Sequence, residues 1–169
     1  LILPYHRSHE LAVEQARGAG KIGTTAKGIG PCYEDKAGRR GLRAGDLRNP
    51  EKFRAQCAEV LAEKNRLASA LLAGAALDVE GFVESYYEKA RCILPFIVDV
   101  SAYLNREMDR GQRVLFEGAQ GTMLDLDHGT YPYVTSSSAA AGGACTGTGV
   151  GPTRIGAVVG VSKAYATRV

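Results

Sequence analysis

Apolar residues recur at helical spacing through the middle of the chain. The run Asn49-Pro50-Glu51 offers a capping side chain, a proline at the first helical position and an acid in the first turn, which together predict a helix start. We expect this helix to end near Gly74. Its predicted buried side consists of Phe53, Cys57, Val60, Leu61, Leu67, Leu71 and Leu72.

A second helical segment begins at Asp78, the residue predicted to cap it. Pro95 is expected to interrupt this helix, and a third helix is expected to reach Met108. Residues 49–110 are therefore predicted to form a helical block, and its aromatic residues are more typical of a core than of a cofactor site. The apolar residues of the second helix recur at Phe82, Tyr86, Ala90 and Ile93.

The first part of the chain has a different pattern. Residues 1–6, LILPYH, are interpreted as a strand end that runs into a turn. Ser8 is a plausible cap for a short helix through about Arg17, which Gly18 would close. From about residue 20 to 48 the chain is rich in glycine and basic residues, and we predict a loop there.

Two short apolar runs in the last part of the chain are predicted strands. They are Arg113–Phe116 and Ile155–Val161, and the second is continuous enough for a strand buried on both faces of a parallel sheet. The predicted fold class is therefore α/β, with a mostly parallel central sheet, flanking helices and a helical insertion at about 49–110. Within one domain, we expect segments at 1–48, 49–110 and 111–169.

The composition excludes several classes of protein. The chain has 169 residues, of which 45% are hydrophobic and 23% charged, as in ordinary globular domains. It has no apolar run of about 18 residues, so we expect no membrane helix. Because it does not begin with Met and ends inside a predicted element, we expect a piece of a longer protein. The cysteines lack metal-ligand spacing and are predicted reduced thiols of a cytoplasmic protein: Cys32, Cys57, Cys92 and Cys145.

The first glycine-rich loop, GTTAKGIGPCYEDKAGRRG at 23–41, combines three kinds of phosphate ligand. Glycines such as Gly23 expose backbone N–H groups, Thr24 and Thr25 offer hydroxyls, and the Arg39-Arg40 pair offers guanidinium groups. Residues 1–56 hold eleven Lys+Arg against six Asp+Glu, an excess suited to a small anion and too small for nucleic acid. A solvated loop with incidental charge is the alternative.

The second loop, EGAQGTMLDLDHGTYPYVTSSS at 117–138, carries different chemistry. The amide of Gln120 can donate and accept at once, as reading a purine edge requires, or it can simply tie two loops together. Asp125, Asp127 and His128 suit a metal or acid–base cluster and equally a capped turn. Thr135 begins a Thr-Ser-Ser-Ser run that could bind an anion ahead of a predicted helix start at 139–144.

Four long segments resemble the adenylosuccinate synthetase family. They are LILPYH, GTTAKGIGPCYEDKAGRRGLRAGDL, VLFEGAQGTMLDLDHGTYPYVTSS and GVGPTRIGAVVGVSKAYATRV, at 1–6, 23–47, 114–137 and 149–169. Their order along the chain makes chance an implausible explanation. Residues 49–110 carry little of this resemblance.

The resemblance implies a role for each matching position. Gly23 and Thr25 would bind the phosphate of IMP from the first loop, and Thr135 would bind it from the second. Gln120 would contact the hypoxanthine ring. Arg39 would reach across a homodimer interface to the IMP phosphate of the neighbouring subunit.

The resemblance also implies a reaction. A GTP-dependent ligase would phosphorylate the IMP 6-oxygen with Mg²⁺ present, and the amine of L-aspartate would displace that phosphate, in AMP biosynthesis in the cytoplasm. The family's catalytic Asp and His, its Mg²⁺ site and the segments that bind guanine and aspartate lie outside these residues. We therefore expect no catalytic residue, no metal ligand and no activity in the isolated chain.

Two departures from the family pattern bear on the phosphate site. Ala26-Lys27 stands in place of the commoner Gly-Arg, and Ser138 stands where Asn is usual. The alternative function is a non-catalytic nucleotide-binding or dimerisation module that shares the scaffold. A partner nucleic acid or membrane is not expected.

Overall fold

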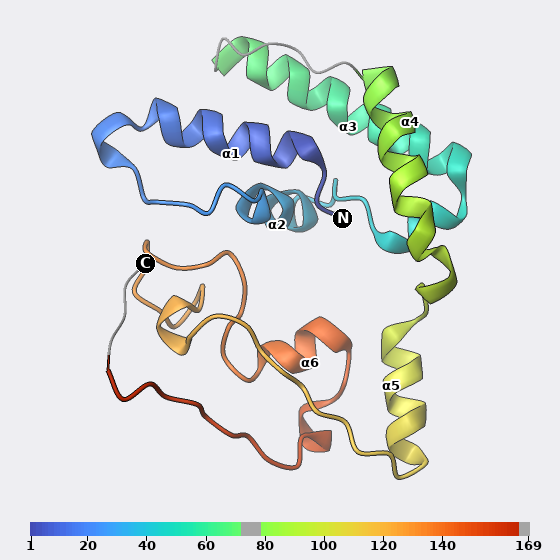
Figure 1. Ribbon diagram of the computed structural model, residues 1–169, viewed down its shortest axis with the longest axis vertical. Coiled ribbons are helices and arrows are strands. Elements are labelled where there is room, and N and C mark those ends of the chain that lie inside the picture. The colour runs from blue at the N-terminus through green and yellow to red at the C-terminus, as the bar shows by residue number, and fades with distance from the viewer. Residues whose placement is uncertain (72–78, 166–169) are drawn as a thin grey trace.

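The computed structural model describes residues 1–71 and 79–165, and helices supply all the regular structure in those ranges (Figure 1). Short 3-10 helices connect the α-helices. The predicted cap Asp78, together with Leu72 and Gly74, lies outside the described residues. The elements in chain order are α1 Pro4–Ala16, η1 Gly18–Gly20, α2 Ile29–Ala37, η2 Ala44–Arg48, α3 Pro50–Leu71, α4 Val79–Ala90, η3 Arg91–Phe96, α5 Val100–Asp109, η4 Thr122–Leu124, α6 Gly143–Thr148 and η5 Pro152–Arg154.

Helix α1 begins five residues earlier than the sequence predicted, with Leu3 rather than Ser8 at the cap position. The expected strand end at 1–6 is wrong, because Pro4 occupies the first helical position, where its missing N–H costs nothing. The ring of His6 completes this start, since its Nδ1 accepts the Leu3 N–H at 2.8 Å. Ser8 is therefore inside the helix and is not its cap.

Helix α2 lies inside the stretch that was predicted to be a loop. Gly28 precedes it with φ of +79°, a left-handed conformation, and Gly38 follows its last residue. The loop prediction for 20–48 is thus wrong for these nine residues. The helix separates the two ends of the glycine-rich segment by about 14 Å, given the rise of an α-helix.

The helix predicted at Asn49-Pro50 is confirmed. The Asn49 Oδ1 accepts the N–H of Lys52 at 3.0 Å, which caps the first turn of α3. Phe53, Cys57 and Leu61 are fully buried on its inner side, whereas Leu67 is exposed despite its place in the apolar pattern. From α4, Val83 and Tyr87 complete the main core, and Phe82, Tyr86 and Ala90 pack on its edge.

The predicted parallel sheet is wrong. Residues 113–116 and 155–161 belong to no regular element, and in the described part of the chain neither pairs with another strand. Leu115 is 89% exposed, and Val159 and Val161 are 86% and 97% exposed. An apolar run indicates a tendency to be buried, whereas a strand also needs a neighbour for its N–H and C=O groups. The segment divisions at about 49 and 110 stay a prediction.

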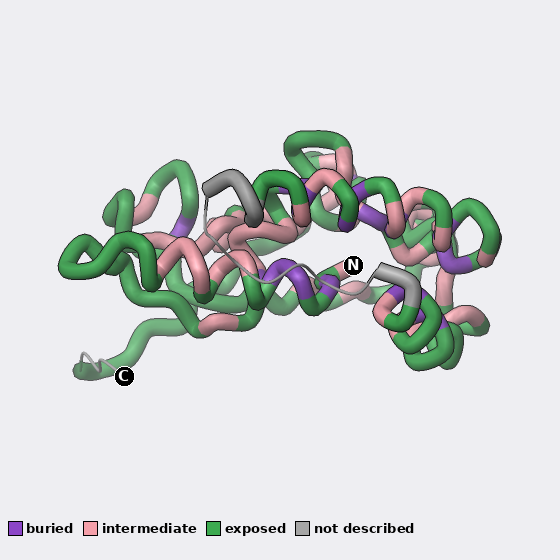
Figure 2. Tube along the Cα trace, turned by 90° about the horizontal axis from the view of Figure 1, so that it is seen from above, coloured by how far each residue is buried: buried purple, intermediate pink, exposed green. Residues whose placement is uncertain are grey.

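Burial is concentrated in the helical part, as Figure 2 shows. The largest buried cluster joins the N-terminal segment, α3 and α4, and the hydroxyl of Tyr86 donates to the Ile2 carbonyl oxygen at 3.0 Å.

All four cysteines are free, and burial raises the pKa of the Cys57 thiol to about 11. Within the described ranges, no helix combines the length and apolarity needed to cross a bilayer.

Candidate functional site

The two candidate loops meet at one cavity of about 840 Å³. Gly23 and Thr25 of the first loop contribute to its wall, and Val134, next to Thr135, contributes from the second. A volume of this size is typical of small-molecule sites. The structure thus brings together loops that are about a hundred residues apart in the sequence. The full lining is Ile22, Gly23, Thr24, Thr25, Leu124, Tyr133 and Val134.

Thr24 and Thr25 differ in what their hydroxyls do. The Thr24 hydroxyl donates to a carboxylate oxygen of Glu10 on α1 and accepts the N–H of Ala26 at 3.2 Å. The Thr25 side chain makes no hydrogen bond with any described residue, and Thr25 is exposed at the cavity. A hydroxyl has a single proton to donate, so Thr25 is the one of the pair with a donor left for a ligand.

The segment that carries Thr135 is held against the first loop and α2. The Thr135 N–H donates to the Leu124 carbonyl oxygen at 2.9 Å, and its hydroxyl lies 3.5 Å from that of Ser137. The Ser136 hydroxyl lies so close to Gly30 that a Cβ there would be 3.2 Å away. The expected anion-binding helix start is wrong, because α6 begins only at Gly143.

Asp125 is a structural carboxylate. It is 1% exposed, and its Oδ2 accepts the N–H of Ala140 at 2.8 Å. Its Oδ1 accepts the N–H groups of Asp127 and His128 at 3.0 and 3.1 Å. These bonds, led by that of Ala140, lower the pKa of Asp125 to about 2. Of the two open interpretations, the capped turn is therefore correct, and the described residues contain no cluster of metal-ligating side chains.

We expect Asp125→Asn to destabilise the chain most above about pH 4. The folded pKa of about 2 lies below the unfolded value, so the carboxylate stabilises the fold above the unfolded pKa. That contribution is lost as the pH falls through the folded pKa. Urea unfolding followed by circular dichroism should show a gap between wild type and variant that narrows in acid.

The control for this prediction is Asp127→Asn, whose carboxylate makes no hydrogen bond within the described ranges. It should unfold like the wild type at each pH. A difference in unfolding free energy between wild type and Asp125→Asn that stays constant from neutral pH to about pH 2 would contradict the structural role of this carboxylate.

Arg39 follows the C-terminal end of α2, whereas the cavity-lining residues of the first loop precede its N-terminal end. Its backbone has φ of +61°, a left-handed conformation that is rare for a side chain of this size. The turn is held because the Asp35 carbonyl oxygen accepts the N–H groups of Arg40 and Gly41, at 2.8 and 3.0 Å. The Arg39 guanidinium is exposed and makes no ion pair with any described residue. The structure therefore does not bring Arg39 to the cavity that Thr25 lines.

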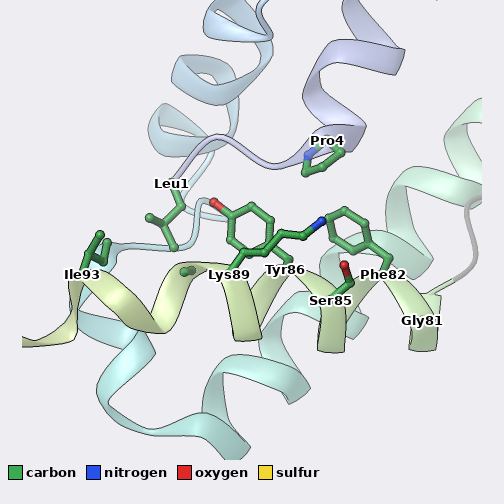
Figure 3. Close-up of a pocket in the computed structure, with 9 residues that line it drawn as sticks. Leu1, Pro4, Gly81, Phe82, Ser85, Tyr86, Lys89 and Ile93 are labelled. Carbon is green, nitrogen blue, oxygen red and sulfur yellow. The ribbon is translucent and has the colours of Figure 1, made fainter.

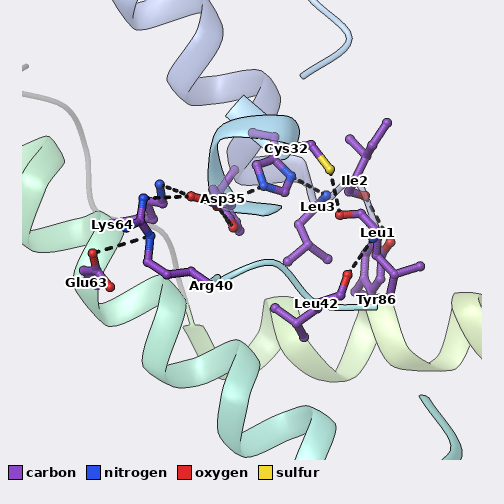
Figure 4. Close-up of polar contacts among 12 residues, drawn as sticks. Leu1, Ile2, Leu3, Cys32, Asp35, Arg40, Leu42, Glu63, Lys64 and Tyr86 are labelled. Atoms are coloured by element: carbon purple, nitrogen blue, oxygen red, sulfur yellow. Dashed lines mark hydrogen bonds and ion pairs between the residues drawn. The ribbon is translucent and has the colours of Figure 1, made fainter. Parts of the chain in front are cut away.

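A buried polar cluster around the Asp35 carboxylate supports the turn at Arg39 (Figure 4). The Asp35 Oδ2 accepts from the Tyr5 hydroxyl at 2.5 Å and lies 3.1 Å from the His6 Nε2. Its Oδ1 accepts from Lys64 Nζ at 2.5 Å and from Arg40 at 3.5 Å. Since the His6 Nδ1 is an acceptor, its Nε2 carries the proton, and burial lowers the pKa of His6 despite the nearby Asp35. Sequence reasoning missed this cluster.

Gln120 stands outside the cavity wall. It is exposed, its φ is +70°, and its amide makes no hydrogen bond within the described part of the chain. It therefore does not tie the two loops together, which was the alternative interpretation. Four residues later, Leu124 does line the cavity.

A second cavity of about 680 Å³ lies between the N-terminal segment and α4 (Figure 3). Phe82, Tyr86 and Lys89 line it together with Leu1 and Pro4. None of the residues predicted to bind a ligand is among its lining. It is therefore separate from the candidate site between the loops.

Comparisons with known proteins agree over the whole chain. The family model described as adenylosuccinate synthetase matches residues 1–169. Adenylosuccinate synthetases of Syntrophotalea carbinolica and Solibacter usitatus are 55% and 56% identical over all 169 residues, which cover 39% of each relative. A structure of fully ligated adenylosuccinate synthetase from Plasmodium falciparum matches with a TM-score of 0.88 and 37% identity, over 98% of this chain and 38% of that one. The chain thus spans about two fifths of the length of these relatives.

Proposed function

Because the chain belongs to the adenylosuccinate synthetase family, we propose that the complete protein is a GTP-dependent ligase that joins IMP to L-aspartate. In this proposal, residues 1–169 supply the two loops that hold IMP. The observation that carries it is the shared cavity, which Gly23 and Thr25 line opposite the segment of Thr135. The protein would act in the cytoplasm, in keeping with its four free cysteines.

The IMP phosphate would lie between the two loops. A dianion that leaves water must regain several strong hydrogen bonds. The unbonded hydroxyl of Thr25 is one donor, and the hydroxyl of Thr135 would be another. The Gly23 N–H donates to Glu14, so Gly23 would contribute by leaving room for the phosphate beside the loop backbone. Hydrogen bonds to a charged group are the strong ones, so these few donors suffice to select a nucleotide over a nucleoside.

Gln120 would face the purine edge. In the first step a phosphoryl group passes from GTP to the IMP 6-oxygen, and in the second the aspartate amine displaces it. The neutral amide of Gln120 can stabilise negative charge on that oxygen without forming an ion pair. The described residues offer no donor set that fits Mg²⁺, so no step of this account depends on a metal ligand from this chain.

Arg39 would serve the partner subunit of a homodimer. Helix α2, about 14 Å long, lies between Arg39 and the first-loop residues that line the cavity. Its guanidinium is exposed and makes no ion pair with any described residue, as a group that binds a partner's ligand requires. Aspartate, IMP and GTP would be the substrates of the complete enzyme.

We expect Thr25→Val to lower the affinity for IMP by about tenfold or more, because a hydroxyl that donates to a charged group is lost. Calorimetric titration with IMP, and with inosine as the phosphate-free ligand, measures this. Thr153→Val is the matched control, since Thr153 is exposed in η5 and away from the cavity lining. Equal affinities of the wild type for IMP and inosine would contradict the proposed phosphate site.

A further inference from the structure

The first loop is bound to one face of α1 by three charged side chains. Arg7, Glu10 and Glu14 are spaced by three and four residues, so they lie on the same side of the helix. The Arg7 Nε donates to the Ala26 carbonyl oxygen at 3.2 Å. Glu14 accepts the Gly23 N–H at 3.2 Å. The helix thus contacts the loop at successive points along its length.

Glu10 makes the central contact of this face. One of its carboxylate oxygens accepts the Thr24 hydroxyl, and the other accepts the N–H of Gly28 at 2.6 Å. Gly28 is buried and immediately precedes α2, so a single carboxylate joins the loop to the start of that helix. The two residues that Glu10 binds, Thr24 and Gly28, lie before and after Thr25 in the sequence. The Thr25 side chain itself makes no hydrogen bond with any described residue.

The loop conformation between these two contacts is an uncommon one. Ala26 has φ of +53°, a left-handed conformation that residues with a Cβ rarely adopt. Its N–H is taken up by the Thr24 hydroxyl and its carbonyl oxygen by Arg7. Such a conformation persists only where its surroundings fix it. Glu10, Thr24 and Arg7 are those surroundings.

We propose that Glu10, acting through Thr24, is a positioning residue that directs the Thr25 hydroxyl into the cavity. This inference rests on the proposed function, because it concerns the same phosphate site. A carboxylate near a phosphate repels it, and Arg7 one turn away on the same face offsets that charge. The role proposed for Glu10 is therefore to accept these hydrogen bonds.

The test is a double-mutant cycle on the full chain, with IMP and inosine affinities measured by calorimetry. Thr24→Val and Glu10→Ala should each weaken IMP binding by about tenfold and leave inosine binding unchanged, and the double variant should be no weaker than either single variant. Thr24→Ser keeps the hydroxyl and should restore wild-type affinity. If Glu10→Ala instead strengthens IMP binding, Glu10 competes with the phosphate and the proposal is overturned. The proposal is also overturned if the two losses add.

A second measurement separates this inference from the proposed function. Without ligand, hydrogen exchange at the Gly28 amide should be faster in Glu10→Ala than in wild type, because no side-chain oxygen is left to accept that proton. Unchanged exchange overturns the positioning role. A wild type that binds no IMP but shows the faster exchange in the variant would contradict the proposed phosphate site and leave the loop contact supported.

Discussion

Replacement of Asp35 with asparagine is expected to lower the free energy of unfolding by about 3–5 kcal/mol, the range for breaking a buried ion pair. Asp35 is 0% exposed and lies among Tyr5, His6, Lys64 and Arg40. A loss of this size is a large part of the stability of a typical domain. Denaturant unfolding followed by circular dichroism measures it.

The physical reason is that the substitution leaves a buried charge without an acceptor. The amide oxygen of asparagine can still accept from Tyr5 and His6, but its amino group would face Lys64 and Arg40, which are donors too. Lys64 is 8% exposed, so water cannot replace the lost carboxylate. In the wild type, burial opposes ionisation of Asp35, and the hydrogen bonds from Lys64 and Tyr5 outweigh it, so its pKa lies below the usual value.

The matched control is Glu84→Gln, which removes the same charge from an exposed pair. Arg54 donates to both carboxylate oxygens of Glu84 at 2.8 and 2.9 Å, with both side chains in solvent. Exposed pairs contribute about 0–1 kcal/mol, so this variant should unfold almost like the wild type. Equal losses in the two variants would contradict a structural role for the buried cluster.

The part of the fold that depends on local signals was predictable. The start of α3 is specified by Asn49 and Pro50, and its buried side by apolar residues at helical spacing. The start of α1 was missed because the cap residue is Leu3, whose N–H the His6 ring accepts, and neither residue type usually signals a helix start. The sheet was predicted from apolar runs, but such runs do not say which segment will pair with them.

The sequence predicted which loops form the candidate site, but not the hydrogen bonds that join them to other elements. Loop composition pointed to the glycines, to Thr24 and Thr25 together and to Thr135, and the family resemblance singled out Gly23 and Thr25. The structure brings the two loops to one cavity. The Thr24 hydroxyl donates to Glu10, which lies on α1, and this contact distinguishes Thr24 from Thr25. It could not be predicted from the loop sequence. Asp35 reads in sequence as one more charge in a basic loop, and only the packing of α1 and α3 against it reveals its burial.

We expect Arg39→Ala to weaken IMP binding by the complete protein, in the homodimer proposed for it, by about tenfold to a hundredfold, because a guanidinium–phosphate contact is lost. If Arg39 acts on the partner's site, mixing this variant with Thr25→Val should restore function. Random exchange gives about half heterodimers, and each has one site free of both substitutions, so about a quarter of all sites recover. Turnover and IMP binding measured before and after subunit exchange give the recovered fraction.

The control mixture pairs Thr25→Val with Thr135→Val, two changes that the cavity places in the same site of one chain. Every site of such a heterodimer carries one defect, so mixing should restore nothing. Recovery in the first mixture alone assigns Thr25 and Arg39 to different sites, as the opposite ends of α2 imply. If neither mixture recovers, Arg39 serves the IMP of its own subunit and the proposed exchange across the dimer is wrong.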